Sequence, residues 1–314
     1  TDSGGQMSLW PGAQISDLSG QTIVVTGANS GIGFYAALEF ARAGAEIVLA
    51  CRSPERGGKA LAEIEAAAPG RARLEMLDLA DFASVHDFAA RLKTRGGKID
   101  ILLNNAGVMA PPTRQTTAQD FELQLGVNFL GHFLLTALLL EQVMNAPAPR
   151  IIQVSSVAHR QGRMVWEDLQ SERGYKAWNA YRQSKLAMLI FAQELARRSA
   201  QGGWGVLSLA AHPGIAATEL VANGPGRNSM IARLQKLAAP FIQQPGDAGA
   251  WPLILAGIDP NAVQGGYYGP QGWQECRGRP GPGKIEPKAL DAEAGQRLWS
   301  IAEQLTGVSL KPAR

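Results

Sequence analysis

The sequence predicts an α/β fold in which a doubly wound parallel sheet carries helices on both faces. Short aliphatic or β-branched runs alternate with helical segments from Thr22 to Ala211, and this alternation requires right-handed crossover connections. A glycine-rich turn follows the first run directly. No linker separates these segments, so we expect a Rossmann-like, three-layer α/β/α single domain over residues 20–314, after an N-terminal extension at residues 1–19.

Each element follows from local periodicity. The first strand is expected at Thr22–Val25, and its helix begins just after Gly33. The other expected strands are residues 46–50, 73–77, 99–103, 150–155 and 205–211, and the other helices are residues 59–68, 82–94, 121–144, 178–198 and 292–305. The glycine- and proline-rich residues 265–283 predict one last short strand and an irregular loop.

Regular alternation fails after His212-Pro213-Gly214. Residues 229–241 are amphipathic and are interpreted as part of a C-terminal substrate lid at about residues 214–245. A membrane-surface helix and ordinary core packing are the alternatives for this segment.

Composition narrows the functional classes. The net charge is +3 with scattered basic residues, which gives no support to a nucleic-acid partner. The two cysteines, Cys51 and Cys276, are far apart and have no CxxC spacing or histidine cluster, so we expect neither a disulfide framework nor a metal site. The apolar stretch Val127–Leu140 is too short for a membrane span and predicts a core helix. The first residues lack signal-peptide features, and a soluble cytoplasmic protein is expected.

The turn at Thr26–Gly33 is placed to bind a dinucleotide pyrophosphate. Glycines allow a tight turn and a close backbone approach, while the following helix presents its free N–H groups to the anion. The expected cofactor-binding residues of this turn are Gly27, Asn29, Ser30, Gly31, Ile32 and Gly33.

The end of the second strand indicates which dinucleotide binds. An acidic residue there would bind the ribose 2′-hydroxyl of NAD, but this chain has Arg52 and no acid before Glu55. Arg52 can pair with a 2′-phosphate, which favours NADP(H) over NAD(H). The alternative is that Arg52 is a solvated loop residue.

Other candidates follow the third and fourth strands. Asp78 and Leu79 are expected to bind the cofactor, with the Asp78 carboxylate placed to accept from the adenine amino group or, alternatively, to cap the next helix. Asn105-Ala106-Gly107 lies at the carboxyl edge, where small residues let the chain pass close to a flat cofactor. Asn128 interrupts an apolar helix, and its buried amide is expected to hold a water or a main-chain turn.

The pair Tyr181 and Lys185 is the candidate catalytic pair. At spacing i, i+4 on a helix the ammonium lies near the phenol. A unit charge roughly 6 Å away, at an effective dielectric of about 20, favours phenolate by about 3 kcal/mol, or around 2 pKa units. An exposed tyrosine beside a solvated lysine is the alternative. Ser155 or Ser156 is placed to polarise a carbonyl, and the absence of a Gly-x-Ser-x-Gly elbow disfavours a hydrolase.

His159 and His212 have no triad spacing and are not assigned a catalytic role.

Together, the TGxxxGxG, NNAG, Asn128, Ser-Ser, YxxxK and Pro213-Gly214 motifs resemble the classical short-chain dehydrogenase/reductase family over roughly residues 20–218. Cys51-Arg52, the segment around Trp166 and the ending around Trp299 are similar to its retinol dehydrogenase-like branch. The departures are a long interval between Ser156 and Tyr181, shared with that branch, a poor match after residue 218, and no apolar N-terminal anchor like that of many animal retinol dehydrogenases.

The resemblance implies residue roles. Tyr181 would exchange a proton with the carbonyl oxygen, and Lys185 would lower its pKa and bind the nicotinamide ribose. Ser156 would polarise the carbonyl and Asn128 would support a water relay to Lys185. Pro213, Gly214 and Thr218 would bind the cofactor, with Thr218 contacting the nicotinamide amide.

These observations predict an NADP(H)-dependent oxidoreductase that transfers hydride between nicotinamide and a carbonyl or alcohol. The small-molecule substrate is expected to be apolar and fairly bulky, because Met230, Ile231, Leu234 and Trp251 are assigned to the lid. The alternatives are a light-dependent or other double-bond reductase and a catalytically silent NADP-binding regulatory protein. The prediction is compatible with a monomer or a homo-oligomer.

Overall fold

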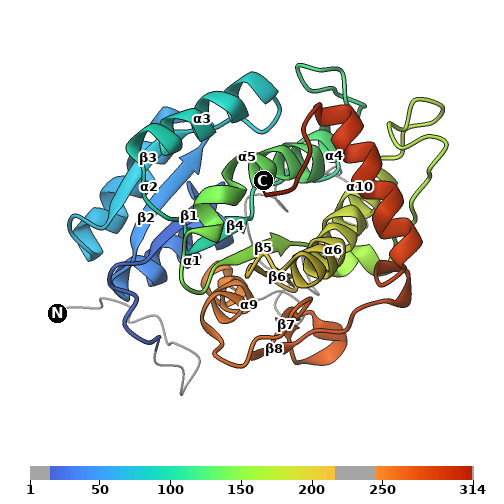
Figure 1. Ribbon diagram of the computed structural model, residues 1–314. Coiled ribbons are helices and arrows are strands. Elements are labelled where there is room, and N and C mark those ends of the chain that lie inside the picture. Colours follow the sequence, from blue (N-terminus) through green and yellow to red (C-terminus); the bar gives the residue numbers. More distant parts are fainter. Residues whose placement is uncertain (1–14, 216–244, 313–314) are drawn as a thin grey trace.

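The computed structural model describes residues 15–215 and 245–312 and shows one eight-stranded sheet between two layers of helices (Figure 1). The strand order is β3-β2-β1-β4-β5-β6-β7-β8, with β8 antiparallel to β7 and all other neighbours parallel. The strands are β1 Thr22–Thr26, β2 Glu46–Cys51, β3 Ala72–Met76, β4 Ile101–Asn104, β5 Arg150–Val154, β6 Leu207–Ala211, β7 Tyr267–Pro270 and β8 Pro280–Pro282. The predicted Rossmann-like α/β fold is confirmed.

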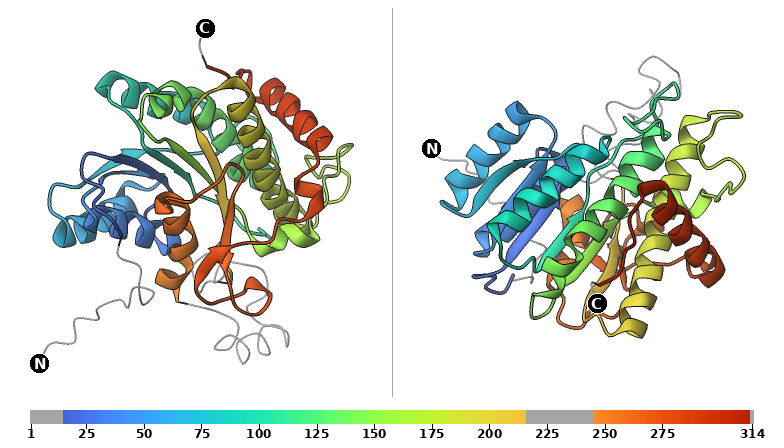
Figure 2. Two further views of the ribbon diagram at one scale, coloured as in Figure 1. Left: turned by 60° about the horizontal axis from the view of Figure 1, so that its bottom comes forward. Right: turned by 45° about the horizontal axis from the view of Figure 1, so that its top comes forward.

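The helices divide between the two faces (Figures 1 and 2). One hydrophobic core packs α3 Phe82–Arg95, α5 Gly131–Met144, α6 Ala177–Gly202 and α10 Ala292–Thr306 on the sheet, and the other packs α1 Gly31–Arg42, α2 Pro54–Ala67 and α9 Gly246–Ile258. Alternate residues of β1 supply both cores, since Val24 belongs to the first and Val25 to the second. The shorter elements are α4 Leu123–Leu125, a π-helix at Gly126–Leu130 and 3₁₀ turns at Val157–Gln161, Trp273–Glu275 and Pro287–Ala289.

Two element predictions were wrong in instructive ways. Helix α2 begins at Pro54 rather than at Lys59, because Ser53 caps it by accepting from the Arg56 N–H at 3.3 Å and proline suits the first helical position. The single strand expected within residues 265–283 is a pair, with β7 and β8 joined antiparallel.

Helix α9 was missed entirely. It carries Pro252 inside it and is apolar nearly all round, so neither helix propensity nor amphipathic spacing marked it. Trp251, assigned from sequence to the substrate lid, instead lies in this helix, 6% exposed and buried in the core that contains α1. The remaining lid residues fall within residues 216–244, outside the described part of the chain.

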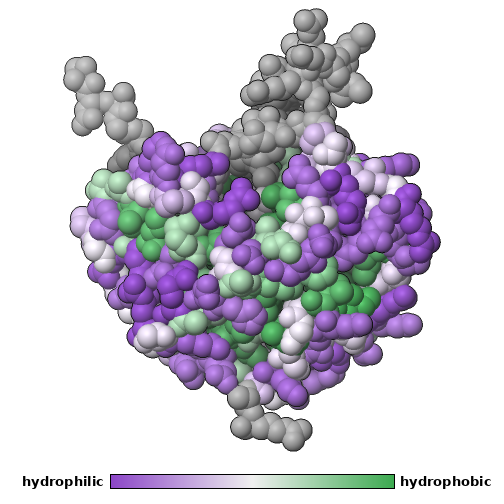
Figure 3. All heavy atoms as spheres, turned by 90° about the horizontal axis from the view of Figure 1, so that it is seen from above, coloured by the Kyte–Doolittle hydropathy of each residue, from purple (hydrophilic) through white to green (hydrophobic). Residues whose placement is uncertain are grey.

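The long apolar helical stretch lies in the protein interior. Residues Leu123–Met144 are long and apolar enough to cross a membrane by length and composition, yet 83% of the apolar window is buried inside the structure. This is the position of a core helix, as the sequence predicted for Val127–Leu140. On the face shown in Figure 3, hydrophilic residues border the apolar areas of the surface.

The C-terminal helix α10 packs against α6 through an aromatic cluster. Trp299 lies edge-on to Phe133 with ring centroids 5.3 Å apart and contacts Phe191 at 5.8 Å. The Arg198 guanidinium covers the Trp299 ring, 4.2 Å from its centroid. The cluster therefore ties the last helix to the helix that carries Tyr181 and Lys185.

We expect Trp299→Ala to lower the free energy of unfolding by about 3–5 kcal/mol, because it removes a large buried ring and leaves a cavity. Trp273 is 75% exposed, so Trp273→Ala should change stability by no more than about 0.5 kcal/mol. Urea unfolding of both variants measures the difference. Equal stability losses would contradict the central role of the Trp299 cluster.

Candidate active site

The carboxyl ends of β1, β4, β5 and β6 bring the predicted site residues to one edge of the sheet. Gly27 follows β1, Asn105 follows β4, Ser155 follows β5 and His212 follows β6. The strands are parallel and adjacent in register, so these segments lie side by side at the ligand-binding edge of such a sheet.

The glycine turn is packed too closely for side chains. Gly27 has φ +68°, and a Cβ there would lie 2.9 Å from the Ala106 Cα. A Cβ on Gly33 would lie 2.3 Å from the Asn105 amide nitrogen. Helix α1 begins at Gly31 with no acidic residue in its first turn and no side-chain cap from Ser30, which leaves its terminal N–H groups for an anion. The other two residues of the turn that are predicted to bind the cofactor, Asn29 and Ile32, are half-buried.

Two arginines lie near this turn. Arg52 is exposed at the end of β2, where the predicted 2′-phosphate contact belongs. The sequence reasoning missed Arg56, whose guanidinium lies 3.3 Å from the Ser30 hydroxyl and donates to it. Its signal was Ser53-Pro54, a helix start that places Arg56 in the first turn of α2 beside the glycine turn.

The segment after β3 decides one of the two roles expected for Asp78, the capping of α3. Asp81, not Asp78, caps α3, because its carboxylate accepts from the Ala83 N–H at 3.0 Å. Asp78 instead holds a tight turn through the Ala80 N–H at 2.9 Å. Leu79 is buried and packs against α5, where a Cβ on Gly131 would meet its carbonyl oxygen at 2.6 Å.

The loop after β4 is hydrogen-bonded to the Thr26 hydroxyl at the end of β1. The N–H groups of Asn105 and Ala106 both donate to it at 2.9 Å, and the Asn105 amide donates to the Thr26 carbonyl at 2.7 Å. The Asn105 side-chain oxygen is buried and has no partner in the described structure. Gly107 completes the loop, and a Cβ on it would be 3.4 Å from the Lys185 Nζ.

Asn128 lies in the π-helix Gly126–Leu130, a type of helix often found at functional sites. Its side-chain oxygen accepts from the Val108 N–H at 2.8 Å, and its amide donates to the Val108 carbonyl at 3.0 Å and to the Ser184 hydroxyl at 2.8 Å. The side chain therefore fixes a main-chain turn, one of the two roles expected for it. The water relay to Lys185 stays a prediction.

The two serines after β5 have different partners. Ser155 donates its hydroxyl to the Lys185 carbonyl at 2.7 Å, which leaves its proton unavailable to a substrate. Ser156 is hydrogen-bonded to Tyr181 through its side chain. The His159 ring bonds the Ser156 carbonyl through Nδ1 at 2.6 Å, which is a structural contact. The geometry thus selects Ser156 as the hydroxyl beside the phenol.

Tyr181 and Lys185 are 5% and 4% exposed on α6, which rules out the exposed pair. The Lys185 Nζ lies 6.0 Å from the centre of the Tyr181 ring and donates to the Val154 carbonyl at 2.9 Å. Burial lowers the pKa of Lys185 to about 8. Burial also raises the pKa of Tyr181 to about 12, against the Ser156 hydrogen bond that acts to lower it.

The expected depression of the Tyr181 pKa is therefore wrong for this state of the protein. The sequence argument counted the ammonium charge and left out desolvation, which disfavours phenolate in a buried site. A phenol with this pKa is protonated at neutral pH, which is the form that donates a proton.

The His212-Pro213-Gly214 segment turns sharply after β6. Gly214 has φ +65°, and its N–H donates to His212 Nδ1 at 3.2 Å. The other ring nitrogen of His212 lies 2.8 Å from a Glu275 carboxylate oxygen, which anchors the segment to the loop between β7 and β8. Thr218, the last predicted nicotinamide contact, lies outside the described residues.

These features fit a dinucleotide. Three features face the same edge of the sheet. They are the glycine turn, where a Cβ would fill the space, the N-terminus of α1, which has no side-chain cap, and the buried Asn105 side-chain oxygen, which has no partner in the described structure. Within residues 15–215 and 245–312 no group of three or more metal-ligating side chains is found.

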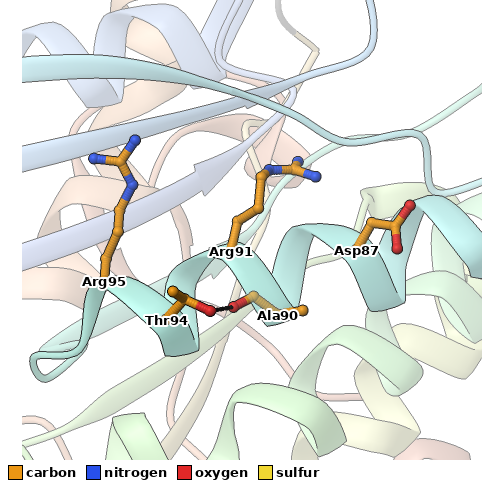
Figure 4. A pocket seen from close by; sticks show the side chains of 5 residues that line it. All are labelled: Asp87, Ala90, Arg91, Thr94 and Arg95. Carbon is orange, nitrogen blue, oxygen red and sulfur yellow. Dashed lines mark hydrogen bonds between the residues drawn. The ribbon is translucent and has the colours of Figure 1, made fainter.

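A surface hollow on α3 lies away from this edge (Figure 4). It is lined by Asp87, Ala90, Arg91, Thr94 and Arg95. Its two arginines pair with Glu75 of β3 at 3.2 Å.

Comparison with known proteins gives the family. Residues 21–227 match the short chain dehydrogenase family. Human retinol dehydrogenase 12 is 38% identical over 295 residues, covering 93% of this chain and 88% of that protein. An uncharacterized protein from Mycobacterium paratuberculosis, solved by crystallography, is 35% identical with a TM-score of 0.79 and covers 95% of this chain and 98% of its own. A short chain dehydrogenase from Escherichia coli CFT073, crystallised with NADPH, is 25% identical with a TM-score of 0.56, over 72% of this chain and 91% of its own.

The chain therefore belongs to the short-chain dehydrogenase family, in its retinol dehydrogenase-like branch. It is an oxidoreductase that depends on a nicotinamide dinucleotide. The family resemblance predicted from the motifs is confirmed.

Stability should fall as the pH falls from 7 to 5. Burial lowers the pKa of His132 to about 3 and that of His159 to about 4, and it also lowers the pKa of His212. The unfolded chain binds protons below pH 6.5 that the folded chain does not, so the free energy of unfolding should drop by about 2 kcal/mol each for His132 and His159. His212 should lower it further, in the same direction. Urea unfolding at both pH values measures this.

The exposed His86 supplies the control, and His86→Gln should keep the same pH dependence. Equal unfolding free energies at pH 7 and pH 5 in the unmodified protein would contradict the neutral, buried state of the three histidines.

Proposed function

We propose that the protein is an NADP(H)-preferring oxidoreductase that interconverts a carbonyl compound and its alcohol, with Tyr181 as the general acid and base. The observation that carries this is the buried pair of Tyr181 and Lys185 at the carboxyl edge, next to the small-residue loop at Gly107 and with the half-buried Ser156 hydrogen-bonded to Tyr181. The presence of both Tyr181 and Lys185 speaks against a catalytically silent protein.

The proposed chemistry divides between cofactor and protein. The bound nicotinamide supplies hydride from C4 to the carbonyl carbon in reduction and accepts it in oxidation. The Tyr181 phenol gives its proton to the carbonyl oxygen, so that the alcohol forms as the phenolate appears. The Lys185 ammonium, 6.0 Å from the ring centre, stabilises that phenolate, and the Ser156 hydroxyl is placed to hold the same oxygen.

The preference for NADP(H) rests on charge near the glycine turn. Arg52 and Arg56 come from the end of β2 and the start of α2, and Arg56 reaches Ser30 in the turn itself. No carboxylate occupies the end of β2 to bind a free ribose 2′-hydroxyl. A phosphate there would be paired by guanidinium groups, which bind it in charge-assisted, bidentate contacts.

An apolar, fairly bulky substrate is supported by Trp178. This residue lies one helical turn before Tyr181, is 45% exposed, and contacts the Tyr181 ring edge-on with centroids 5.9 Å apart. An exposed indole beside the proposed proton donor offers a flat apolar surface. Related retinol dehydrogenases are named for an apolar alcohol, in agreement with this surface. A cytoplasmic location stays a prediction, as does the choice between monomer and homo-oligomer.

A screen of NADPH oxidation over aldehydes, ketones and quinones, with NADH in parallel and in darkness, tests the function. Tyr181→Phe should lower turnover on the best substrate by about two to four orders of magnitude, because it removes the transferred proton. NADPH should still bind, as followed by its fluorescence. Turnover close to that of the unmodified protein would sink the proposed role.

A matched control removes a phenol elsewhere. Tyr268 donates its hydroxyl to Asp259 at 2.9 Å in the core that contains α9, so Tyr268→Phe should keep most of the turnover. Activity that requires light would instead support a light-driven double-bond reductase.

Arg52→Asp should shift the preference from NADPH toward NADH by at least about tenfold, since a charge-assisted phosphate contact is worth on the order of 1.5–3 kcal/mol. Arg56→Ala should shift it in the same direction. The control is Lys93→Asp, the same change of charge at an exposed position of α3 on the other face of the sheet. The measurement is the ratio of kcat/KM for NADPH to kcat/KM for NADH in each variant. An unchanged ratio in Arg52→Asp would show that Arg52 does not contact the cofactor.

A further inference from the structure

His132 is fully buried in α5 and joins two parts of the proposed cofactor site. Its Nε2 lies 2.9 Å from the Thr26 hydroxyl at the end of β1, and its Nδ1 lies 2.8 Å from the Asn128 carbonyl in the π-helix. The sequence motifs do not include His132. One of its partners, Thr26, is 106 residues away, and the other, Asn128, lies in an irregular helix.

The hydrogen bonds fix the tautomer of His132. A carbonyl oxygen only accepts, so Nδ1 carries the proton and donates it to Asn128. The Thr26 hydroxyl already accepts the N–H groups of Asn105 and Ala106, which fill both of its lone pairs. Its own proton goes to the imidazole Nε2 at 2.9 Å rather than to the more distant Leu103 carbonyl at 3.4 Å.

This network leaves no place for a second proton on the ring. An imidazolium would aim an N–H at a hydroxyl whose acceptor sites are both taken. Burial, together with the nearby Lys185 charge, lowers the pKa of His132 to about 3, against the Asn128 hydrogen bond that acts to raise it. The ring therefore stays neutral at physiological pH, with one donor and one acceptor in fixed places.

The two partners of His132 hold opposite ends of the same loop. Thr26 holds the N–H groups at Asn105 and Ala106, and Asn128 holds both backbone polar groups of Val108. The Asn128 amide also donates to Ser184, which in turn donates to the Tyr181 carbonyl at 2.9 Å. The imidazole thus sets the distance between the end of β1, the loop at residues 105–108 and the helix of the proposed proton donor.

We propose that His132 is a positioning residue that keeps the loop at residues 105–108 shaped to receive the nicotinamide half of the cofactor. The proposal rests on the proposed function, because it assumes that NADP(H) lies over this loop. His132 itself touches neither cofactor nor substrate. Its effect passes through Thr26 and Asn128.

Replacement by leucine tests the network by removing both contacts at similar volume. His132→Leu leaves the Asn128 carbonyl and the Thr26 hydroxyl proton without this buried partner, and we expect the dissociation constant of NADPH to rise about tenfold. His132→Gln can donate through its amide nitrogen and accept through its oxygen, so it should recover most of the affinity. Fluorescence titration with NADPH measures both without requiring a substrate.

A second pair of variants changes the other partner of the His132–Thr26 hydrogen bond. Thr26→Val removes the hydroxyl and should weaken NADPH binding, while Thr26→Ser should be closer to the unmodified protein. Combined with His132→Leu, Thr26→Val should add less than its separate effect, since both break one network. In steady-state assays the KM for NADPH should rise more than the KM for the carbonyl substrate.

Gln142→Leu provides the structural control. Gln142 is a buried residue of α5 that donates to the Leu92 carbonyl at 3.2 Å, and its loss should cost stability with no change in NADPH affinity. The proposal is overturned if His132→Leu behaves like Gln142→Leu, or if glutamine restores none of the affinity. If His132→Leu does not fold, the glutamine and Thr26 variants decide. Failure of the proposed function is a separate result, in which the unmodified protein binds no NADPH.

Discussion

The parallel register of β1, β4, β5 and β6 is the constraint on which the site depends. Because the four strands run in one direction and are aligned residue by residue, their carboxyl ends meet at one edge. Residues widely separated in sequence then face a common volume. The antiparallel strand β8 lies at the border of the sheet, where it adds to the loop that anchors His212 without disturbing this edge.

At this edge, burial changes the pKa values of the candidate catalytic residues more than individual contacts do. The phenol of Tyr181 and the ammonium of Lys185 are both withdrawn from water, which disfavours the charged form of each. The pair is consequently held with a protonated phenol and an ammonium whose pKa is close to physiological pH. Groups with shifted pKa values in a cleft are typical of sites that move protons.

The sequence was most informative where a local pattern has a single physical cause. The glycines of the first turn, the strand periodicities and the Tyr181–Lys185 spacing each predicted a feature that the structure contains. It was least informative where two effects compete over long range. Desolvation of Tyr181 cannot be read from residues around it in the chain, and helix α9 forms despite Pro252 because its apolar surface is buried against the sheet and α1.

The contact of Trp299 with Phe133 and Phe191 also bears on the order of folding during synthesis. The helix that carries the proposed proton donor is made long before α10, yet one of its buried faces is completed only by the ring that α10 supplies. Until α10 has left the ribosome, that face stays uncovered and the apolar rings are open to water or to a chaperone. Helix α6 is thus expected to be fully packed only after α10 has docked, so that a chain that lacks α10 has no finished site to fill.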